Sequence, residues 1–424
     1  MTPFSDIRTI YSYTRTKTFQ RVCTMPANYR LARYALYLLF LLPGLTLASW
    51  VTRTPALRDG LSASTEQMGM ILFGFSAGAM CGILSAGRLI ARFGAHRMMR
   101  TGLLGLSAGM LVLAGSSELN SAWCAFAGLF IYGIGMGWAD IAVNIEGAAV
   151  EREIDAPIMT TLHGFFSLGT LVGALAGMGM TALQVPLDLH LIVAALLSAV
   201  VTLALAPHAP RASEGAANQP TTQTAEFAWG ALLSDRRLLL IGFVVLAMAL
   251  AEGAANDWLP LLMIDGHGFA ETTGTLIYLV FTLGMTLGRF AGAPVVRRFG
   301  RTLTLRASAL LGAASLALVV FCDVQWIAAA AVMLWGIGAS LGFPLAISAA
   351  GESGAHSDQR VRLAATAGYL AFLVGPPLLG FIGEHHGLRL AMLPVLTLVA
   401  LAFVVASALR EQAALPVDTC EKTG

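Results

Sequence analysis

The sequence predicts an all-α membrane protein with twelve transmembrane helices, arranged as two pseudo-symmetric halves of six helices each. Hydrophobic residues make up 57% of the 424 residues and charged residues only 12%, whereas soluble domains carry about 25% charged residues. Twelve apolar windows are long enough to cross a bilayer, which takes about 20 residues per helix. Short strings also recur between the two halves, which indicates a duplicated unit.

The recurring strings lie at a nearly constant offset along the chain. Three pairs of positions are separated by 206, 203 and 205 residues, namely Phe93 and Phe299, Tyr132 and Trp335, and Pro55 and Pro260. One such coincidence is expected by chance in a chain rich in Gly and Ala, but three in the same order favour a repeat of roughly 200 residues. A repeat of this size in an apolar chain is typical of transporters.

The predicted helices follow the apolar windows in chain order. They cover approximately 33–52, 66–88, 97–115, 121–145, 159–181, 189–206, 238–259, 273–294, 303–321, 326–350, 361–383 and 388–408. A helix pairs every backbone N–H and C=O internally, as the hydrocarbon core of a bilayer requires. In the fifth helix, Gly169, Gly173 and Gly177 share one face, and we interpret that face as a packing surface for a neighbouring helix.

These helices define the expected domains. Residues 33–206 form the N-terminal half and residues 238–408 the C-terminal half, flanked by an extension over 1–32 and a tail over 409–424. Residues 207–237 are polar and read as a flexible linker. The first 24 residues have no apolar core of the kind found in cleavable signal peptides, so we expect no cleavage there. Met25 is a second candidate for the start of translation.

The distribution of basic residues predicts the orientation in the membrane. With a cytoplasmic N-terminus, 23 of the 26 Lys and Arg residues lie on the inner side, and only Arg53, Arg58 and Arg389 lie on the outer side. Because cytoplasmic loops carry the excess of positive charge, both termini are expected in the cytoplasm and the protein in the bacterial inner membrane. The net charge of +2 gives no reason to expect a nucleic-acid partner, and we expect a monomer.

No pattern in the sequence favours an enzyme, a metal site or a bound cofactor. The five cysteines are scattered without paired spacing, so neither a disulfide framework nor a metal site is predicted. No P-loop is present, which argues against ATP as the energy source. Neither a nucleophile with its base nor a cluster of metal ligands is visible at membrane depth, so we expect no enzymatic activity.

Ionisable residues inside the predicted helices are the functional candidates, because a charge at the centre of a bilayer costs at least about 2.5–3.5 kcal/mol. In the helix over 121–145, Tyr132, Asp140 and Asn144 share one face. Asp140 is the first candidate for a proton site, and the alternative is an acid at the helix end that reaches cytoplasmic water. His163, at the start of the next helix, either relays protons to Asp140 or is a surface residue.

The helix over 238–259 holds a second group of polar residues. Glu252 and Asn256 share one face, and Asp257 follows directly. Glu252 lies deep enough for an unpaired charge to be costly, so it suits proton coupling, and the alternative is a structural partner on a neighbouring helix. Asp257 is closer to the outer surface, and we expect it to be solvated or paired with Arg53. For Arg289 we favour a side chain that reaches the inner surface over one that pairs with an acid.

Two further helices carry side chains suited to solute binding. Thr46, Trp50 and Arg53 share one face of the first helix, and the tenth helix contributes Trp335 and Ser340. Trp50 and Trp335 offer rings on which a solute can stack, and the alternative for Trp50 is anchoring at the membrane interface. Arg53 either binds an anionic group or lies in outer water.

Two short motifs give the chain a family resemblance. The string Gly-x-Leu-x-x-Arg-Phe-Gly-x-x-Arg follows the second helix, with Gly87, Arg92, Gly94 and Arg97 among its residues. Together with two six-helix halves and a central loop, it resembles the major facilitator superfamily from about residue 33 to 410. The segments 48–55 and 144–147 further resemble a poorly characterised bacterial inner-membrane subgroup of that superfamily.

The motif departs from the usual pattern of the superfamily at one position. An acidic residue that helps to latch the cytoplasmic gate normally precedes the Arg, but this position is Ala91 here and Arg297 in the second half. The basic residues of the two loops therefore have two open interpretations, as gate latches or as contacts for anionic lipid headgroups. The loop residues concerned are Gly87, Arg92, Gly94, Arg97, Arg298, Gly300 and Arg301.

The resemblance implies that the first, fourth, seventh and tenth helices line a central cavity, which is where most of the polar candidates lie. We therefore expect a secondary active transporter that moves a small polar organic solute by alternating access, with protons as the coupling ion. Proton-driven efflux of drug-like compounds is the alternative transport function. A membrane sensor that transports nothing is the alternative from a different class.

Overall fold

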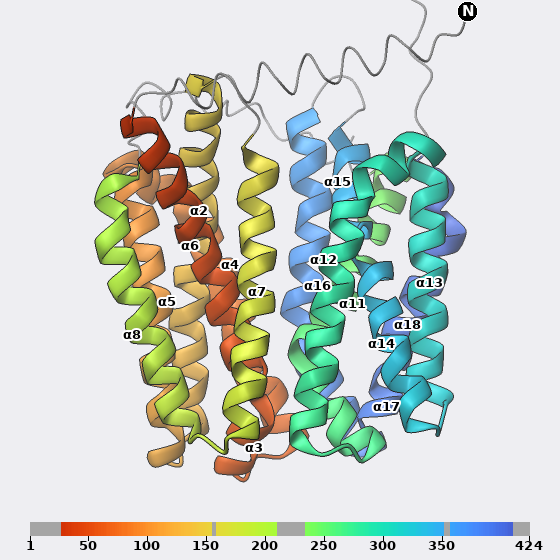
Figure 1. Ribbon diagram of the computed structural model, residues 1–424. Helices are drawn as coiled ribbons and strands as arrows, with labels where there is room; N and C mark the ends of the chain where they lie inside the picture. Colours follow the sequence, from red (N-terminus) through yellow and green to blue (C-terminus); the bar gives the residue numbers. More distant parts are fainter. Residues whose placement is uncertain (1–26, 155–157, 210–233, 352–356, 410–424) are drawn as a thin grey trace, which may run out of the picture. The chain divides into compact units, whose positions relative to one another are not determined.

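The computed structural model describes residues 27–154, 158–209, 234–351 and 357–409. Most of the N-terminal extension, including Met25, most of the predicted linker and most of the C-terminal tail lie outside the described residues. Within the described residues, twelve helices are long and apolar enough to cross a membrane. Each of them overlaps one of the twelve predicted windows, so the predicted fold class is confirmed. The helices of each unit run roughly parallel to one another (Figure 1).

The chain divides into two compact units. Unit 1 comprises Met1–Gln223 with Ala270–Leu279, and unit 2 comprises Thr224–Phe269 with Val280–Gly424. The first residues of α12 group with unit 1, and the domain boundaries expected from the sequence stay predictions. The helices of unit 1 are α2 (Ala27–Val51), α3 (Thr54–Gly60), α4 (Thr65–Phe93), α5 (Ala95–Glu118), α6 (Ala122–Ile154), α7 (Met159–Ala182) and α8 (Leu187–Leu205).

Unit 2 holds the remaining helices. They are α11 (Arg236–Leu261), which continues into the π-helical turn η2 (Leu262–Gly266), α12 (Glu271–Phe299), α13 (Arg301–Phe321), α14 (Gln325–Ala339), α15 (Gly342–Gly351), α16 (Ser357–His386), α17 (Leu388–Ala391) and α18 (Leu393–Val405). The window expected as one helix over 326–350 is therefore two helices, α14 and α15. Pro344 explains the break, because it offers no N–H to the carbonyl of Ser340 four residues earlier.

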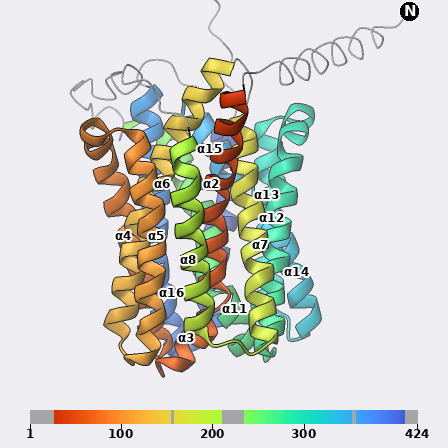
Figure 2. The ribbon, with the colours of Figure 1, turned by 60° about the vertical axis from the view of Figure 1, so that its left-hand side comes forward.

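Glycines allow the helices of unit 1 to approach closely. A Cβ atom at Gly169 or Gly173 of α7 would collide with the backbone of α2 at Leu41 or Leu45, which confirms the packing role expected for this stripe. A Cβ atom at Gly133 of α6 would collide with the backbone of α4 at Phe75 and Ala79. Figure 2 shows α4, α5 and α6 close together in unit 1. Packing of this kind replaces the hydrophobic effect, which drives little association between helices in lipid.

The turns between α4 and α5 and between α12 and α13 repeat each other. Gly94 and Gly300 adopt positive φ angles of 84° and 76°, a region that favours glycine. Each glycine ends one helix and starts the next, and the two lie 206 positions apart. The repeat predicted from the sequence therefore corresponds to the same helix–glycine–helix geometry in both units.

Candidate functional site

An ion pair joins two membrane-spanning helices of unit 2. Nη2 of Arg289, on α12, donates a hydrogen bond to Oε1 of Glu252, on α11, at 2.9 Å. The side chains of Arg289 and Glu252 are 39% and 22% exposed, so both still reach the surface of the protein. The expectation that Arg289 extends to the inner surface is wrong, because its guanidinium is held by Glu252. The pair places a titratable carboxylate next to a permanent cation within the apolar helices.

Asp257 lies on α11 five residues after Glu252 and has no such partner. Its side chain is only 7% exposed, and within the described residues its carboxylate makes no hydrogen bond or ion pair. The expectation of a solvated Asp257 is therefore wrong. A buried carboxyl group without a partner is costly while it is ionised, so this position is suited to binding a proton. Asn256 lies between the two acids and is engaged in an interaction of its own.

Two tryptophans of unit 2, Trp258 and Trp335, lie in the packed interior. Trp335 of α14 is completely buried, and its ring meets that of Phe281 edge-on with centroids 5.7 Å apart. The indole N–H groups of Trp335 and Trp258 are buried without an acceptor in the described part of the chain. Ser340 is buried at the break between α14 and α15, where its hydroxyl donates to the carbonyl of Ile337 at 2.7 Å.

Three predicted residues of unit 1 come together at one place. Nδ2 of Asn144 donates to Oδ1 of Asp140 at 3.2 Å and to the Asp140 carbonyl at 2.8 Å. His163, on α7, lies close enough for its charge to act on the Asp140 carboxyl group, and its ring packs edge-on against Phe40 with centroids 5.3 Å apart. Asp140 and His163 are exposed at the surface of the protein and Asn144 is partly exposed.

Thr46, Trp50 and Tyr132 form a buried cluster between α2 and α6. The hydroxyl groups of Thr46 and Tyr132 are 3.0 Å apart and share a hydrogen bond. The rings of Trp50 and Tyr132 meet edge-on with centroids 6.3 Å apart. Trp50 is 2% exposed, so it does not anchor unit 1 at a lipid–water interface. These side chains stabilise the packing of α2 on α6, and their role in solute binding stays a prediction.

Arg53 lies between α2 and α3 and is only 5% exposed. Its guanidinium donates to Oγ1 of Thr181 at 3.3 Å and to the carbonyl of Val185 at 2.7 Å. Burial lowers the pKa of Arg53 from its ordinary value, although an arginine remains charged in proteins. The side chain therefore holds the α7–α8 turn against the end of α2 and does not lie in outer water. The pairing expected between Arg53 and Asp257 is not among these contacts.

The basic residues of the repeated turns lie at the surface. Arg92, Arg97 and Arg298 are exposed, the guanidinium of Arg92 lies 5.3 Å from the ring of Phe93, and Arg301 takes part in an interaction. A Cβ atom at Gly87 would meet no atom within 4 Å inside the protein. Both interpretations of these loops, as gate latches or as lipid contacts, stay predictions.

Two polar features of the structure were not predicted as sites. Glu146 lies just past the predicted window over 121–145, but α6 continues to Ile154 and Glu146 is 1% exposed. Asp235 caps the N-terminus of α11 by accepting from the N–H of Leu238 at 3.1 Å, and it forms an ion pair with Arg360 of α16 at 2.6 Å. Burial raises the pKa of Asp235, but the hydrogen bonds from Arg360 and Leu238 outweigh burial and hold the pKa below its usual range.

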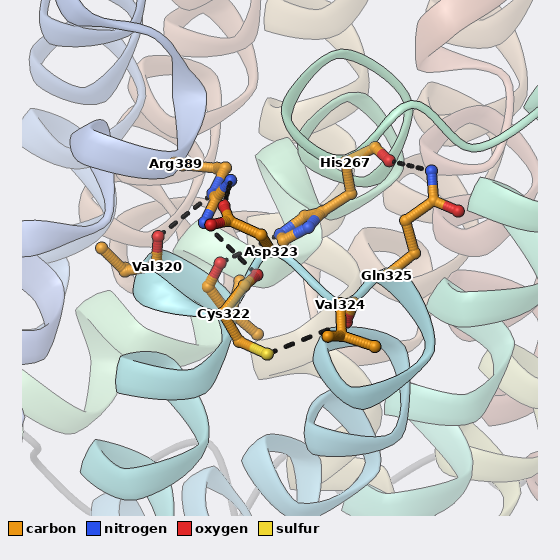
Figure 3. A network of polar contacts seen from close by, with 8 residues as sticks. His267, Val320, Cys322, Asp323, Val324, Gln325 and Arg389 are labelled. Carbon is orange, nitrogen blue, oxygen red and sulfur yellow. Dashed lines mark hydrogen bonds and ion pairs between the residues drawn. The ribbon is translucent and has the colours of Figure 1, made fainter.

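A network of polar contacts joins three segments of unit 2, namely the residue after η2, the connection between α13 and α14, and α17 (Figure 3). Arg389 donates to the carbonyl of Val320 at 3.1 Å and to that of Cys322 at 3.3 Å, and it forms an ion pair with Asp323 at 2.9 Å. His267 is buried after η2, and its Nε2 lies 2.9 Å from the carbonyl of Val319. The positive charge of Arg389 therefore balances the partial negative charge at the C-terminal end of α13, and its hydrogen bonds connect this end to α17.

The His267 contact predicts how stability depends on pH. Burial lowers the pKa of His267 and the charge of Arg389 lowers it further, although the hydrogen bond to Val319 and the charge of Asp323 act in the opposite direction. An unfolded chain takes up this proton near pH 6.5, whereas the folded protein resists protonation to a lower pH, so stability falls as the pH falls below about 6.5. We expect the thermal unfolding midpoint in detergent to drop between pH 7.5 and 5.5, and to drop less in His267→Gln. An equal drop in both proteins would show that His267 does not carry the effect.

Among the described residues, no group of three His, Cys, Asp or Glu side chains is placed to hold a metal ion. Comparisons with known proteins agree with a transport role. The family model for the Major Facilitator Superfamily matches residues 36–359.

Curated bacterial relatives extend over most of the chain. An uncharacterized transporter from Sinorhizobium fredii is 28% identical over 379 residues, which cover 88% of this chain and 96% of that protein. An uncharacterized MFS-type transporter from Yersinia pestis is 29% identical and covers 84% of this chain and 89% of its own length. The membrane protein MosC from Rhizobium meliloti is 28% identical, with 87% of each chain covered.

Solved structures show the same fold. A variant of the nucleoside transporter NupG superposes with a TM-score of 0.75 at 13% sequence identity, over 90% of this chain and 100% of that one. The E. coli fucose:proton symporter FucP superposes with a TM-score of 0.63 at 16% identity, over 91% of this chain and 98% of that one. Identities this low carry information about the fold alone.

Proposed function

This chain belongs to the major facilitator superfamily, and we propose that it is a proton-coupled secondary transporter that moves a small polar organic solute by alternating access. It is a multi-pass membrane protein and a transporter of that superfamily. The observation that carries the proposal is the ion pair between Glu252 and Arg289 on two membrane-spanning helices, with the buried Asp257 one and a half turns away.

The ion pair offers a physical route for coupling. When the Glu252 carboxylate takes up a proton it becomes neutral, and its attraction to Arg289 weakens. The guanidinium is then left without a counter-charge in an apolar helix, which favours an anionic or polar solute group as its new partner. When the site opens to the opposite side, loss of the proton restores the ion pair and favours release of the solute. Proton and solute then cross in the same direction.

Unit 1 offers a second position for the proton. Asp140 accepts a hydrogen bond from Asn144 and lies within electrostatic reach of His163, whose ordinary pKa lies close to neutral pH. We assign Glu252 and Asp257 the primary coupling role. An ionisable residue inside the membrane is energetically costly, so its presence there indicates a function. Asp140 with His163 is the alternative path for the same proton.

A polar solute is favoured by the chemistry of these residues. Arg289, Glu252 and Asn256 offer charged and amide groups that recognise hydroxyl, carbonyl or carboxylate groups. The solved structures with the same fold include a nucleoside transporter and a fucose:proton symporter, which are both transporters of polar organic solutes. Efflux of drug-like compounds and a sensor without transport remain the competing functions, and one experiment separates all three.

The experiment is uptake into vesicles reconstituted with the purified protein. A panel of sugars, nucleosides, amino acids and organic acids is offered with and without an inward proton gradient. We expect at least one polar solute to accumulate only when the gradient is present. Accumulation of an apolar drug that is driven by an outward proton gradient would favour efflux. The absence of any solute flux would favour the sensor.

The proposed location is the bacterial inner membrane with both termini in the cytoplasm, and it predicts which residues react from outside. In a variant without native cysteines, single cysteines at Leu119 and Leu183, which are 69% and 77% exposed, are expected to react with an impermeant maleimide in intact cells. A cysteine at Phe299, which is 56% exposed, is expected to react only after permeabilisation. Labelling of position 299 in intact cells would reverse the orientation.

A further inference from the structure

An apolar groove runs between α11 and α16 in unit 2. It has a volume of about 340 Å³, and its lining residues include Leu239, Phe243, Leu246, Leu363 and Leu370. Two of them, Leu239 and Leu370, are 47% and 49% exposed, so the groove is open along its length. Thr366 is the lone lining residue with a polar side chain. The groove is not part of the Glu252–Arg289 site, because its lining on α11 ends at Leu246.

Basic residues surround one end of this groove. The Asp235–Arg360 ion pair lies just beyond Leu238 and Leu363, where α11 and α16 begin. Four arginines and two aspartates lie in the first residues of these two helices, at positions 235–237 and 358–362. Since Arg360 neutralises Asp235, positive charge remains in excess, and both Arg236 and Arg362 are exposed.

We propose that this groove binds an anionic phospholipid, with one acyl chain along α11 and α16 and the phosphate at Arg236 and Arg362. An apolar groove continuous with a basic helix end matches the two chemical parts of such a lipid. Basic pockets between transmembrane helices are known to select anionic headgroups of this kind. The acyl chain covers the exposed parts of the lining side chains, chiefly Leu239 and Leu370. The site is independent of the proposed transport function.

Gly242 provides a way to fill the groove without disturbing the helices. It lines the groove, and a Cβ atom placed there would meet Ala367 Cβ at 3.8 Å, which is ordinary van der Waals contact. A leucine at this position therefore projects into the groove. Gly115 of α5 is the matched control, because a Cβ atom there would meet nothing within 4 Å and the same change occurs in another helix.

The test uses the full chain in detergent and phosphatidylglycerol with a photoreactive group at the end of one acyl chain, compared with phosphatidylcholine that has the same chains. In the wild type we expect phosphatidylglycerol to label peptides of α11 and α16 more strongly than phosphatidylcholine does. Gly242→Leu is expected to lose this labelling, while Gly115→Leu keeps it. Arg236→Gln or Arg362→Gln is expected to lower the preference for phosphatidylglycerol by roughly fivefold, the contribution of one arginine near an anionic surface.

Three results would overturn the proposal. Equal labelling by the two lipids would show that the groove does not select an anionic headgroup. Unchanged labelling in Gly242→Leu would show that the lipid binds elsewhere. Loss of transport in Gly242→Leu with lipid labelling intact would assign the groove to the solute path. Native mass spectrometry of the same variants counts the retained lipid independently of transport, so failure of this proposal is distinguishable from failure of the transport proposal.

Discussion

Glu252→Gln is expected to abolish accumulation of solute driven by a proton gradient. Glutamine matches glutamate in size and can still accept a hydrogen bond from Arg289, but it neither takes up nor releases a proton. Glutamine removes the counter-charge of Arg289, but the retained hydrogen bond and the partial exposure of both side chains limit the loss of stability. The variant should therefore be folded, and exchange of solute without a gradient should persist. The measurement is the ratio of internal to external solute in vesicles, with and without the gradient.

Matched variants separate coupling from structure in this prediction. Asp59→Asn removes an ion pair of the same length, 2.9 Å, which joins Arg58 and the exposed Asp59 within α3, and should leave accumulation unchanged. Arg289→Gln combined with Glu252→Gln removes both charges. If Glu252 were only a structural partner, the double variant would recover the accumulation lost in the single one. If Glu252→Gln accumulates solute like the wild type, Asp257 and Asp140 become the next carboxyl groups to test, as Asp257→Asn and Asp140→Asn.

Gly133→Ala is expected to cause a large loss of stability from a single added methyl group. A Cβ atom at this position would collide with the backbone of α4 at Phe75 and Ala79, which cannot move aside as a flexible side chain would. Overpacking of this kind typically costs about 1–3 kcal/mol, and occasionally more. We expect a lower unfolding midpoint and less folded protein in the membrane, measured by thermal unfolding and by size-exclusion chromatography in detergent.

Gly115→Ala is the control for this prediction, because it makes the same chemical change in a helix where the new Cβ atom meets nothing within 4 Å. Alanine favours a helix over glycine by up to about 1 kcal/mol, so Gly115→Ala should be neutral or slightly stabilising. Similar midpoints for Gly133→Ala and Gly115→Ala would show that the close approach of α6 to α4 contributes little.

The helices and their repeat could be predicted because the membrane imposes strong rules on sequence. A spanning segment must be apolar and long enough, and it must satisfy its own backbone, so each window already indicates a helix. The turn at Gly94 and Gly300 was visible as a repeated motif for a similar reason, since a positive φ favours glycine. The tenth helix was expected as one span over 326–350, and Pro344, a residue that interrupts helix regularity, accounts for its division into α14 and α15.

The partners of the buried charges could not be predicted from the sequence. Helices that are apolar on every side give little indication of how they are rotated, so nothing in the sequence placed Arg289 beside Glu252. Asp257 was expected in water because it lies near the end of its window, but α11 continues past it to Leu261 and the side chain is buried. In the same way, α6 extends past its apolar window, and Glu146 on the added turns is buried.

Proton movement driven by solute is the most direct test of the central claim. Vesicles that contain the purified protein and an internal pH dye receive, on the outside, a solute identified by the uptake panel, with no gradient imposed at the start. We expect the interior to become more acidic with the wild type and to stay unchanged with Glu252→Gln, because Glu252 takes up a proton on the outside and releases it on the inside as the solute enters. Solute entry through the wild type with no change in internal pH would contradict proton coupling.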